Sequence, residues 1–142
     1  MLLDINHARI VHLEWELKLE KILIHGGEAV KVANHNECML GSWLYTEGLK
    51  SYKHFPETML LEGAHAQFHD LAQKVVNEHA RGREQKAAEH FKQVQELSRE
   101  IIFLLTKIEF RVIQRKKTVD KIKAPFRFVG NLFSKKKSDC EC

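Results

Sequence analysis

The sequence predicts an all-α protein: an antiparallel four-helix bundle with a long C-terminal helix and a mobile basic tail. Proline and glycine, the residue types that interrupt regular helices, are scarce. The 142 residues include only two prolines and seven glycines. Apolar residues also recur at alternating spacings of three and four, which is typical of a helix face packed against neighbours. A chain of this length is expected to form one compact domain.

The first helix is expected over about residues 4–25, because Gly26-Gly27 provides a stop signal at its end. Its bundle-facing stripe is predicted to be widened by Leu13, Leu17 and Leu23. The members of that stripe are spaced alternately by four and three: Ala8, His12, Trp15, Leu19 and Ile22.

The second helix is expected to begin near Asn34–Asn36, both good N-cap residues, and to reach about Tyr52. Gly41 and Gly48 are costly inside a helix, so they are expected to mark the close approach of another helix. The third helix is predicted over about residues 56–80, with a buried seam of Leu61, His65, Phe68, Ala72 and Val75.

The fourth helix is predicted over about residues 83–122, and Pro125 is expected to interrupt the chain beyond it. Its heptad seam is unbroken, and the helix would be roughly 60 Å long at 1.5 Å per residue. Because the other helices are shorter, part of it should overhang the bundle and expose an apolar seam, which predicts a homodimer. The seam consists of Ala87, Phe91, Val94, Ser98, Ile101, Leu105, Ile108, Val112, Arg115, Val119 and Ile122.

Charge is divided unevenly along the chain. Residues 111–142 hold ten Lys or Arg and three Asp or Glu, a balance of +7, whereas the whole chain carries +4 and the rest therefore −3. We accordingly expect residues 1–122 to form the bundle and residues 123–142 a basic tail. The tail is expected to be solvated or to touch an anionic membrane surface weakly. No recognition motif indicates nucleic-acid binding.

Cysteine usage and hydropathy favour a cytoplasmic protein. Three cysteines, Cys38, Cys140 and Cys142, are too few and too unevenly placed for a disulfide framework. No apolar run approaches the roughly 18 residues of a membrane span, and the start of the chain lacks the features of a signal peptide. Cys140 and Cys142 are weak evidence for metal transfer or lipidation.

Three histidines and one cysteine are the candidate metal ligands. His65 and His69 are four residues apart, so they share one face of a helix and are placed to bind one ion. His12 occupies a seam position on the first helix, and Cys38 stands in the first turn of the second, where the helix terminus favours a thiolate. Three imidazoles and one thiolate make a complete tetrahedral zinc set.

Two alternatives concern these residues individually. A lone histidine on a core face is more often a hydrogen-bonded structural residue, and a lone buried cysteine is more often a small apolar one. Burying several imidazoles without partners is costly, however, and a shared metal would satisfy them together. His35, three residues before Cys38, is the rival for the fourth position.

Three motifs carry a resemblance to a known family. They are His12-Leu13-Glu14-Trp15, Cys38-Met39-Leu40-Gly41-Ser42-Trp43 and His65-Ala66-Gln67-Phe68-His69. In their order and spacing, over roughly residues 5–80, the chain resembles the chemoreceptor zinc-binding (CZB) domain. The resemblance implies a helical-bundle zinc domain of bacterial signalling, in chemotaxis or cyclic-di-GMP control, with His12, Cys38, His65 and His69 as the ligands of Zn²⁺. It also implies a response to zinc or to oxidants such as hypochlorous acid.

The motifs of an output module are not evident, so the chain resembles a free-standing version with an unknown signalling partner. Four protein ligands leave no open position for water or substrate, which argues against an enzyme. An oxygen-binding di-iron or haemerythrin-like bundle is one alternative, suggested by Glu62 three residues before His65, but a second Glu-x-x-His motif in register is missing. A metal-free scaffold bundle is the other.

Overall fold

The computed structural model describes residues 4–27 and 30–134, with side chains described as far as Lys123. Its contacts divide the chain into two units, Met1–Ile108 and Glu109–Cys142. The described residues form four helical segments and contain no strand, which confirms the all-α prediction. None of the described helices is long and apolar enough to cross a membrane.

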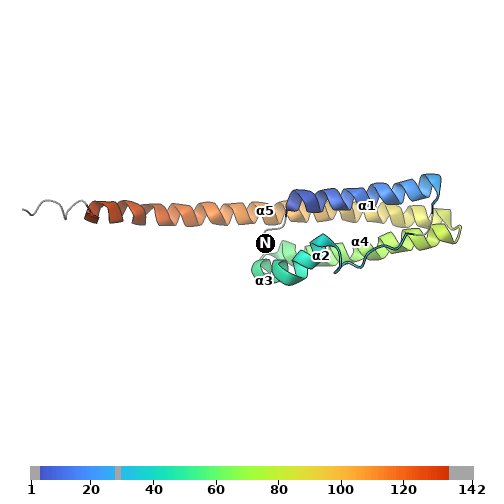
Figure 1. The fold of residues 1–142 in the computed structure, drawn as a ribbon, viewed down its shortest axis with the longest axis horizontal. Helices are drawn as coiled ribbons and strands as arrows, with labels where there is room; N and C mark the ends of the chain where they lie inside the picture. Colours follow the sequence, from blue (N-terminus) through green and yellow to red (C-terminus); the bar gives the residue numbers. More distant parts are fainter. Residues whose placement is uncertain (1–3, 28–29, 135–142) are drawn as a thin grey trace, which may run out of the picture. The chain divides into compact units, whose positions relative to one another are not determined.

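Helix α1, Ile5–His25, is the first element of the first unit (Figure 1). The side chain of Asp4 caps it by accepting a 3.0 Å hydrogen bond from the backbone N–H of His7. Its C-cap, Gly26, has φ of 70°, a conformation that favours glycine. The predicted bounds of this helix are therefore confirmed.

The second segment has three parts, α2 (Met39–Trp43), the π-helix η1 (Leu44–Gly48) and α3 (Leu49–Tyr52). The predicted start near Asn34 is wrong, because Cys38 is extended and is itself the N-cap of α2. Residues before it instead form a loop that runs along α4 (Figure 1). The π-helical turn was not predicted; such turns are rare and recur near functional sites.

Helix α4 covers Pro56–Ala80, and α5 covers Glu84–Ser134. Gly82, with φ of 71°, forms the turn between them. Within the first unit the two helices run antiparallel, since Lys107 Nζ near the end of that part of α5 lies 3.6 Å from Glu57 Oε1 at the start of α4. A 2.7 Å bond from Arg9 Nη2 to Thr106 Oγ1 likewise joins α5 to the start of α1.

The core of the first unit follows the predicted seams. All five predicted seam residues of α4 are buried, as are Ala8, His12, Leu19 and Ile22 of α1. On α5 the seam is buried at Ala87, Val94, Ser98, Ile101, Leu105 and Ile108. The predicted widening of the α1 stripe is wrong at Leu13 and Leu17, which are 44% and 63% exposed, whereas Leu23 is half-buried.

The two glycines of the second segment mark close approaches, though not to another helix. A Cβ on Gly41 would lie 1.7 Å from the backbone oxygen of His35, in the loop before α2. A Cβ on Gly48 would lie 2.8 Å from the ring of Trp43, in the same segment. The loop thus packs on the second segment at Gly41, where only glycine fits, whereas Gly48 lies against a ring of its own segment.

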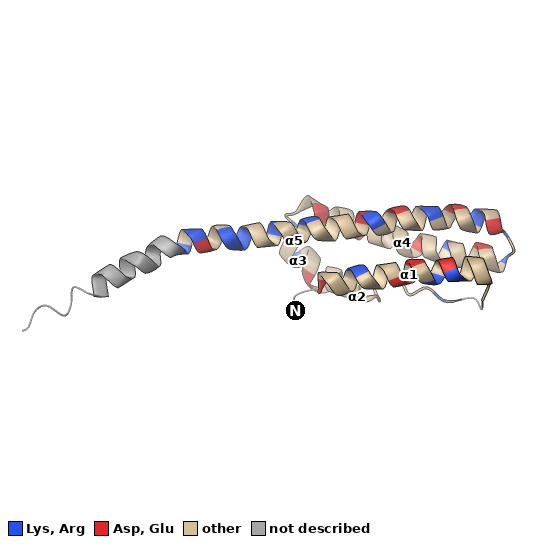
Figure 2. Cartoon of the chain, turned by 90° about the horizontal axis from the view of Figure 1, so that it is seen from above, with Lys and Arg blue, Asp and Glu red and all other residues tan. Residues whose placement is uncertain are grey.

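The second unit is helical from Glu109 to Ser134, as the continuation of α5. The expected end of this helix at residue 122 is too early, because the helix passes through Pro125. A proline removes one backbone donor and disfavours helix at the residue before it, at about 3 kcal/mol, and the structure accommodates that cost without ending the helix. Lys and Arg dominate its described charges (Figure 2). Lys135–Lys137, Cys140 and Cys142 lie outside the described residues, whereas residues 123–134 of the predicted mobile tail are helical.

Candidate metal centre

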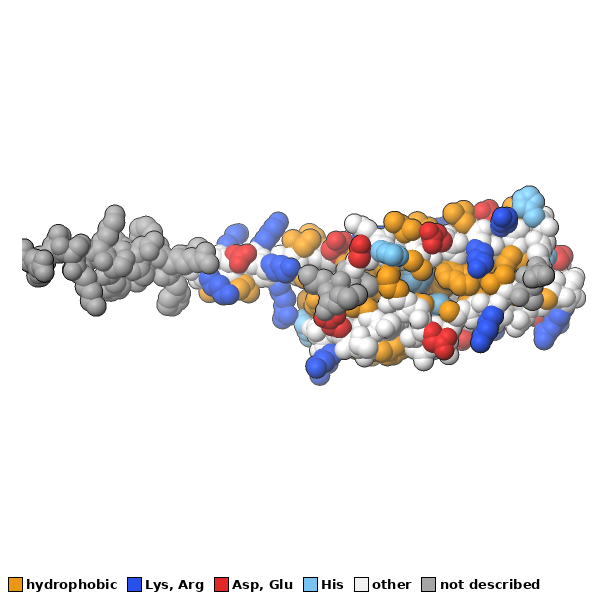
Figure 3. Space-filling view, in the orientation of Figure 1, with side chains coloured by type: hydrophobic (Ala, Val, Ile, Leu, Met, Phe, Trp, Pro, Cys, Tyr) orange, Lys and Arg blue, Asp and Glu red, His pale blue; other side chains and the backbone are white. Residues whose placement is uncertain are grey.

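Three histidine side chains meet inside the first unit. His12 comes from α1, and His65 and His69 come from successive turns of one face of α4. They are 2%, 0% and 5% exposed, respectively. Each offers a ring nitrogen, and these three atoms all lie within 4.8 Å of one another. In the space-filling view, histidine appears only as small patches among other side chains over the body of this unit (Figure 3).

Cys38 joins this cluster from the N-cap of α2. Its Sγ lies 3.1 Å from Nε2 of His65. The same Nε2 lies 3.1 Å from Nε2 of His69. Three candidate ligand atoms therefore converge on one point, with the ring of His12 centred 5.3 Å from that of His65.

Two backbone carbonyls orient the imidazoles. The carbonyl of Ala8 lies 2.8 Å from Nδ1 of His12, and the carbonyl of Ala33 lies 2.7 Å from Nδ1 of His69. Because a carbonyl only accepts hydrogen bonds, both Nδ1 atoms carry the proton. A neutral ring then has a bare lone pair on Nε2, which is how histidine binds a metal.

His65 is the most desolvated member of the cluster. Burial, followed by the charges that His12, His69 and His35 would carry, lowers the pKa of His65 to about 3. Burial also lowers the pKa of His12 and of His69. At neutral pH all three rings are therefore uncharged, as ligands must be. Nδ1 of His65 is buried and has no hydrogen-bond partner among the described residues.

The sulfur of Cys38 sits between two backbone groups. It receives a 3.4 Å hydrogen bond from the N–H of Gly41, and its thiol faces the carbonyl of His35 at 3.6 Å. Burial raises the pKa of the Cys38 thiol, and the amides of Gly41 and Leu40 only partly oppose that effect. The amides at the helix terminus thus favour the thiolate as expected, but desolvation outweighs them and the net effect favours the thiol.

The donor set fits zinc. Ligand distances of about 2.0–2.1 Å for nitrogen and 2.3 Å for sulfur imply tetrahedral edges of about 3.3 Å between nitrogens and 3.6 Å between sulfur and nitrogen. The two observed separations of 3.1 Å are slightly shorter than these edges. A single proton on Nε2 of His65 can serve only one of its two neighbours, whereas a cation satisfies both.

The rival residues lie beside the cluster. The ring of His35 is centred 6.5 Å from that of His65 and 6.0 Å from that of Tyr45. Glu62 interacts with Tyr45 and raises its pKa, after burial. The one metal-binding group among the described residues consists of His12, His65 and His69, with no carboxylate. Nothing here favours the di-iron alternative, which requires bridging carboxylates.

The supporting carbonyls of Ala8 and Ala33 were not foreseen from the sequence. Every residue carries a carbonyl, so no residue type signals this role. The spacing of Ala8 four residues before His12 is the only hint, because Nδ1 of a helical histidine can reach the preceding turn.

Comparison with protein families identifies the class. Residues 12–76 match the chemoreceptor zinc-binding domain, CZB. This stretch runs from His12 to Val76 and includes Cys38, His65 and His69. Neither a curated protein nor a solved structure matches the chain.

This match confirms the resemblance to the CZB domain over residues 12–76. The family is one of zinc-binding signalling domains, and the clustered histidines and Cys38 agree with that class.

Proposed function

We propose that this chain binds one Zn²⁺ through His12, Cys38, His65 and His69 and serves as a sensor in bacterial signalling. The observation that carries the proposal is the pair of carbonyls that hold Nδ1 protonated on His12 and His69. Each of these two rings then has a lone pair on Nε2 inside the core. Nε2 of His65 lies close to both Nε2 of His69 and Sγ of Cys38. Buried lone pairs need an acid partner, and a metal ion supplies one.

The four residues have different roles in this proposal. His65 and His69 form the fixed half, because both sit on α4. His12 would link α1 to this half of the site as a third ligand. Cys38 would be the soft ligand, and it would coordinate as a thiolate, giving up the proton that burial otherwise favours on its sulfur. Release of Cys38 would free α2 and the π-helical turn to move against α4.

A closed set of four protein ligands favours regulation over catalysis, since no position remains for substrate. We further propose that the output belongs to chemotaxis or cyclic-di-GMP control and passes to a signalling protein. The family match supports signalling in general. Pull-down of chemotaxis and cyclase components from cells, with zinc-loaded and zinc-free protein, tests this output.

Cys38 is also proposed as an oxidant sensor. A thiolate takes the oxygen of hypochlorous acid, so that Cys–S⁻ and HOCl give Cys–SOH and Cl⁻; sulfur loses two electrons and chlorine gains them. The sulfenic acid is a poorer ligand, and one corner of the site opens. Zinc release on stoichiometric HOCl, lost in Cys38→Ser at matched zinc loading, is the expected result.

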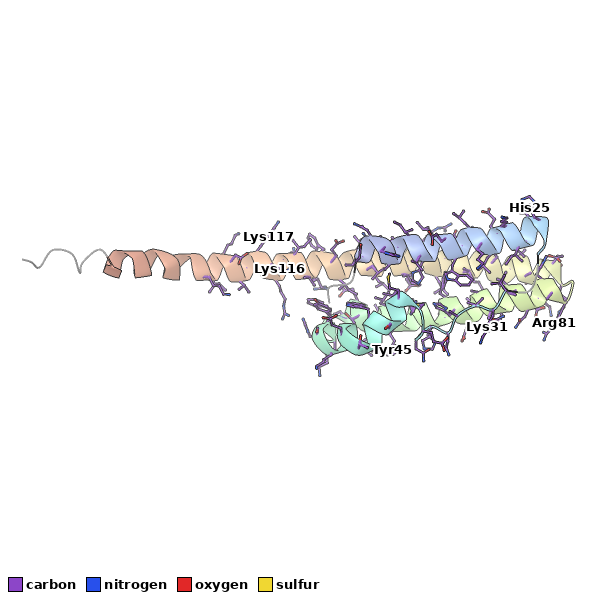
Figure 4. All side chains as sticks on the ribbon, viewed as in Figure 1. His25, Lys31, Tyr45, Arg81, Lys116 and Lys117 are labelled. Atoms are coloured by element: carbon purple, nitrogen blue, oxygen red, sulfur yellow. The ribbon has the colours of Figure 1, made fainter. Side chains whose placement is uncertain are left out.

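Metal content decides the central proposal. Purified wild-type protein should hold one zinc per chain, and Cys38→Ala and His12→Ala should lose it during dialysis against a mild chelator. His25→Ala is the matched control, because His25 lies at the other end of α1 and is exposed (Figure 4). Equal zinc content in all four proteins would contradict the site, and iron in place of zinc would restore the di-iron alternative.

We propose a homodimer through the seam of α5. In the second unit, Val119 and Ile122 of the predicted seam are 45% and 63% exposed. A heptad seam of this kind pairs with a copy of itself in coiled coils. The charge-preserving pair Val119→Gln and Ile122→Gln should shift sedimentation to a monomer, whereas an unchanged sedimentation coefficient would contradict the interface.

A further inference from the structure

A hollow opens at the surface beside the metal centre. It has a volume of about 320 Å³ and lies between the loop before α2 and the exposed edge of α4. Its walls include Lys31, His35 and Glu37 from the loop, and His69 and Asp70 from α4. One residue of the cluster, His69, thus forms part of a surface cavity, while His12 and His65 do not line it.

The donors around this hollow suit a divalent cation in transit. His35 offers an imidazole, and Glu37 and Asp70 offer carboxylates, all types that bind zinc. Lys31 adds a positive charge to the wall (Figure 4). Together Lys31, Glu37 and Asp70 carry a net charge of −1, so the hollow favours a cation only mildly. A weak site next to a strong one is what stepwise metal exchange requires.

His35 brings a donor of this hollow close to the buried site. Its ring is centred 6.5 Å from that of His65, and it is only partly buried. Its backbone carbonyl, by contrast, faces the Cys38 thiol and packs on Gly41. Backbone and side chain therefore have separable roles, because replacing the imidazole leaves the carbonyl in place.

We propose that this hollow is the route by which zinc enters and leaves, and that His35 is a transient ligand that receives the ion as a resident ligand releases it. The inference rests on the proposed zinc site. It predicts that His35 governs the rate of exchange and leaves the equilibrium affinity nearly unchanged, since His35 contributes to the path and not to the final set.

The test measures zinc release from the zinc-loaded 142-residue chain into excess chromogenic chelator, together with uptake by the metal-free chain. His35→Ala and His35→Phe should slow both rates by about tenfold, or about 1.4 kcal/mol in barrier height. His35→Phe keeps a ring against Tyr45 but has no donor atom. His35→Asp restores a donor and should recover most of the rate. Asn36→Ala, in the same loop but outside the hollow, is the matched control.

The outcomes separate this inference from the proposed function. Wild-type protein without zinc would overturn both. Zinc-loaded wild type with unchanged exchange rates in His35→Ala and His35→Phe would overturn the entry route alone. A loss of stoichiometry or a hundredfold loss of affinity in those variants would also overturn it, because His35 would then be a resident ligand. Slow exchange that His35→Asp does not restore would assign the effect to packing and reject the route.

Discussion

Gly41→Ala should damage the zinc site without touching any proposed ligand. The added Cβ would lie 1.7 Å from the backbone oxygen of His35, whereas real Cβ atoms essentially never approach closer than 3.0 Å. The loop or α2 must therefore move by at least 1.3 Å (3.0 minus 1.7). The Cβ is fixed to the backbone at residue 41 and the oxygen belongs to the backbone of His35, so no side-chain rotation can relieve the clash.

The displacement is large on the scale of coordination. Zinc ligands hold their distances to within about 0.2 Å, and Cys38 lies between the two clashing residues in sequence. We expect Gly41→Ala to weaken zinc binding by at least tenfold. Overpacking should also lower the free energy of unfolding of the metal-free protein by about 1–3 kcal/mol.

The assay pairs urea denaturation of the metal-free protein with zinc competition against a chelator of known affinity. Gly63→Ala is the matched control, because a Cβ there meets nothing within 4 Å and the residue lies inside α4, two positions from His65. The control should be stabilised by up to about 1 kcal/mol through helix propensity. If Gly41→Ala matches wild type in both measurements, the close approach at His35 is not a determinant of the site.

Further predictions concern pH, metal and a buried hydroxyl. Since the pKa of His65 is lowered to about 3, with those of His12 and His69 also lowered, the unfolded chain binds protons first as pH falls below about 6.5. The free energy of unfolding of the metal-free protein should therefore fall between pH 6.5 and 4.5, by up to about 1.4 kcal/mol per pH unit for each histidine; a flat profile in urea titrations would count against buried neutral rings. Free zinc at 100 times its Kd should add about 2.7 kcal/mol to stability, and a melting temperature insensitive to chelator would favour the metal-free scaffold. Ser98→Ala should stabilise the bundle by about 1 kcal/mol, because the Ser98 hydroxyl is fully buried with no hydrogen-bond partner among the described residues; a loss of stability on chemical denaturation would mean that the hydroxyl has a bound water.

The periodic pattern was enough to predict most of the helices and their buried faces. The buried faces of α1 and α4 and the buried seam of α5 follow from three-and-four spacing, because only residues on one face of a helix can share a core. The pattern misjudged Leu13 and Leu17, since apolar residues flanking a stripe are not obliged to be buried. The expectation that Pro125 interrupts the chain was also wrong, because α5 continues through it to Ser134 despite the lost backbone donor.

The second segment shows where local rules failed. Asn34 and Asn36 are good caps by residue type, yet the cap is Cys38. Gly41 lies against the backbone carbonyl of His35 beside this cap, a contact that composition does not reveal. The π-helical turn over Leu44–Gly48 likewise has no sequence signature that we can identify.

By itself, the sequence determined the helical class and the pair His65 and His69, because helical spacing fixes which side chains share a face. Motif order added Cys38 and His12 as candidates. Only the tertiary structure brought the four together, set the lone pairs of His12 and His69 through the carbonyls of Ala8 and Ala33, and raised the pKa of the Cys38 thiol through burial. These depend on distances between segments and on desolvation, which exist only once the helices have packed.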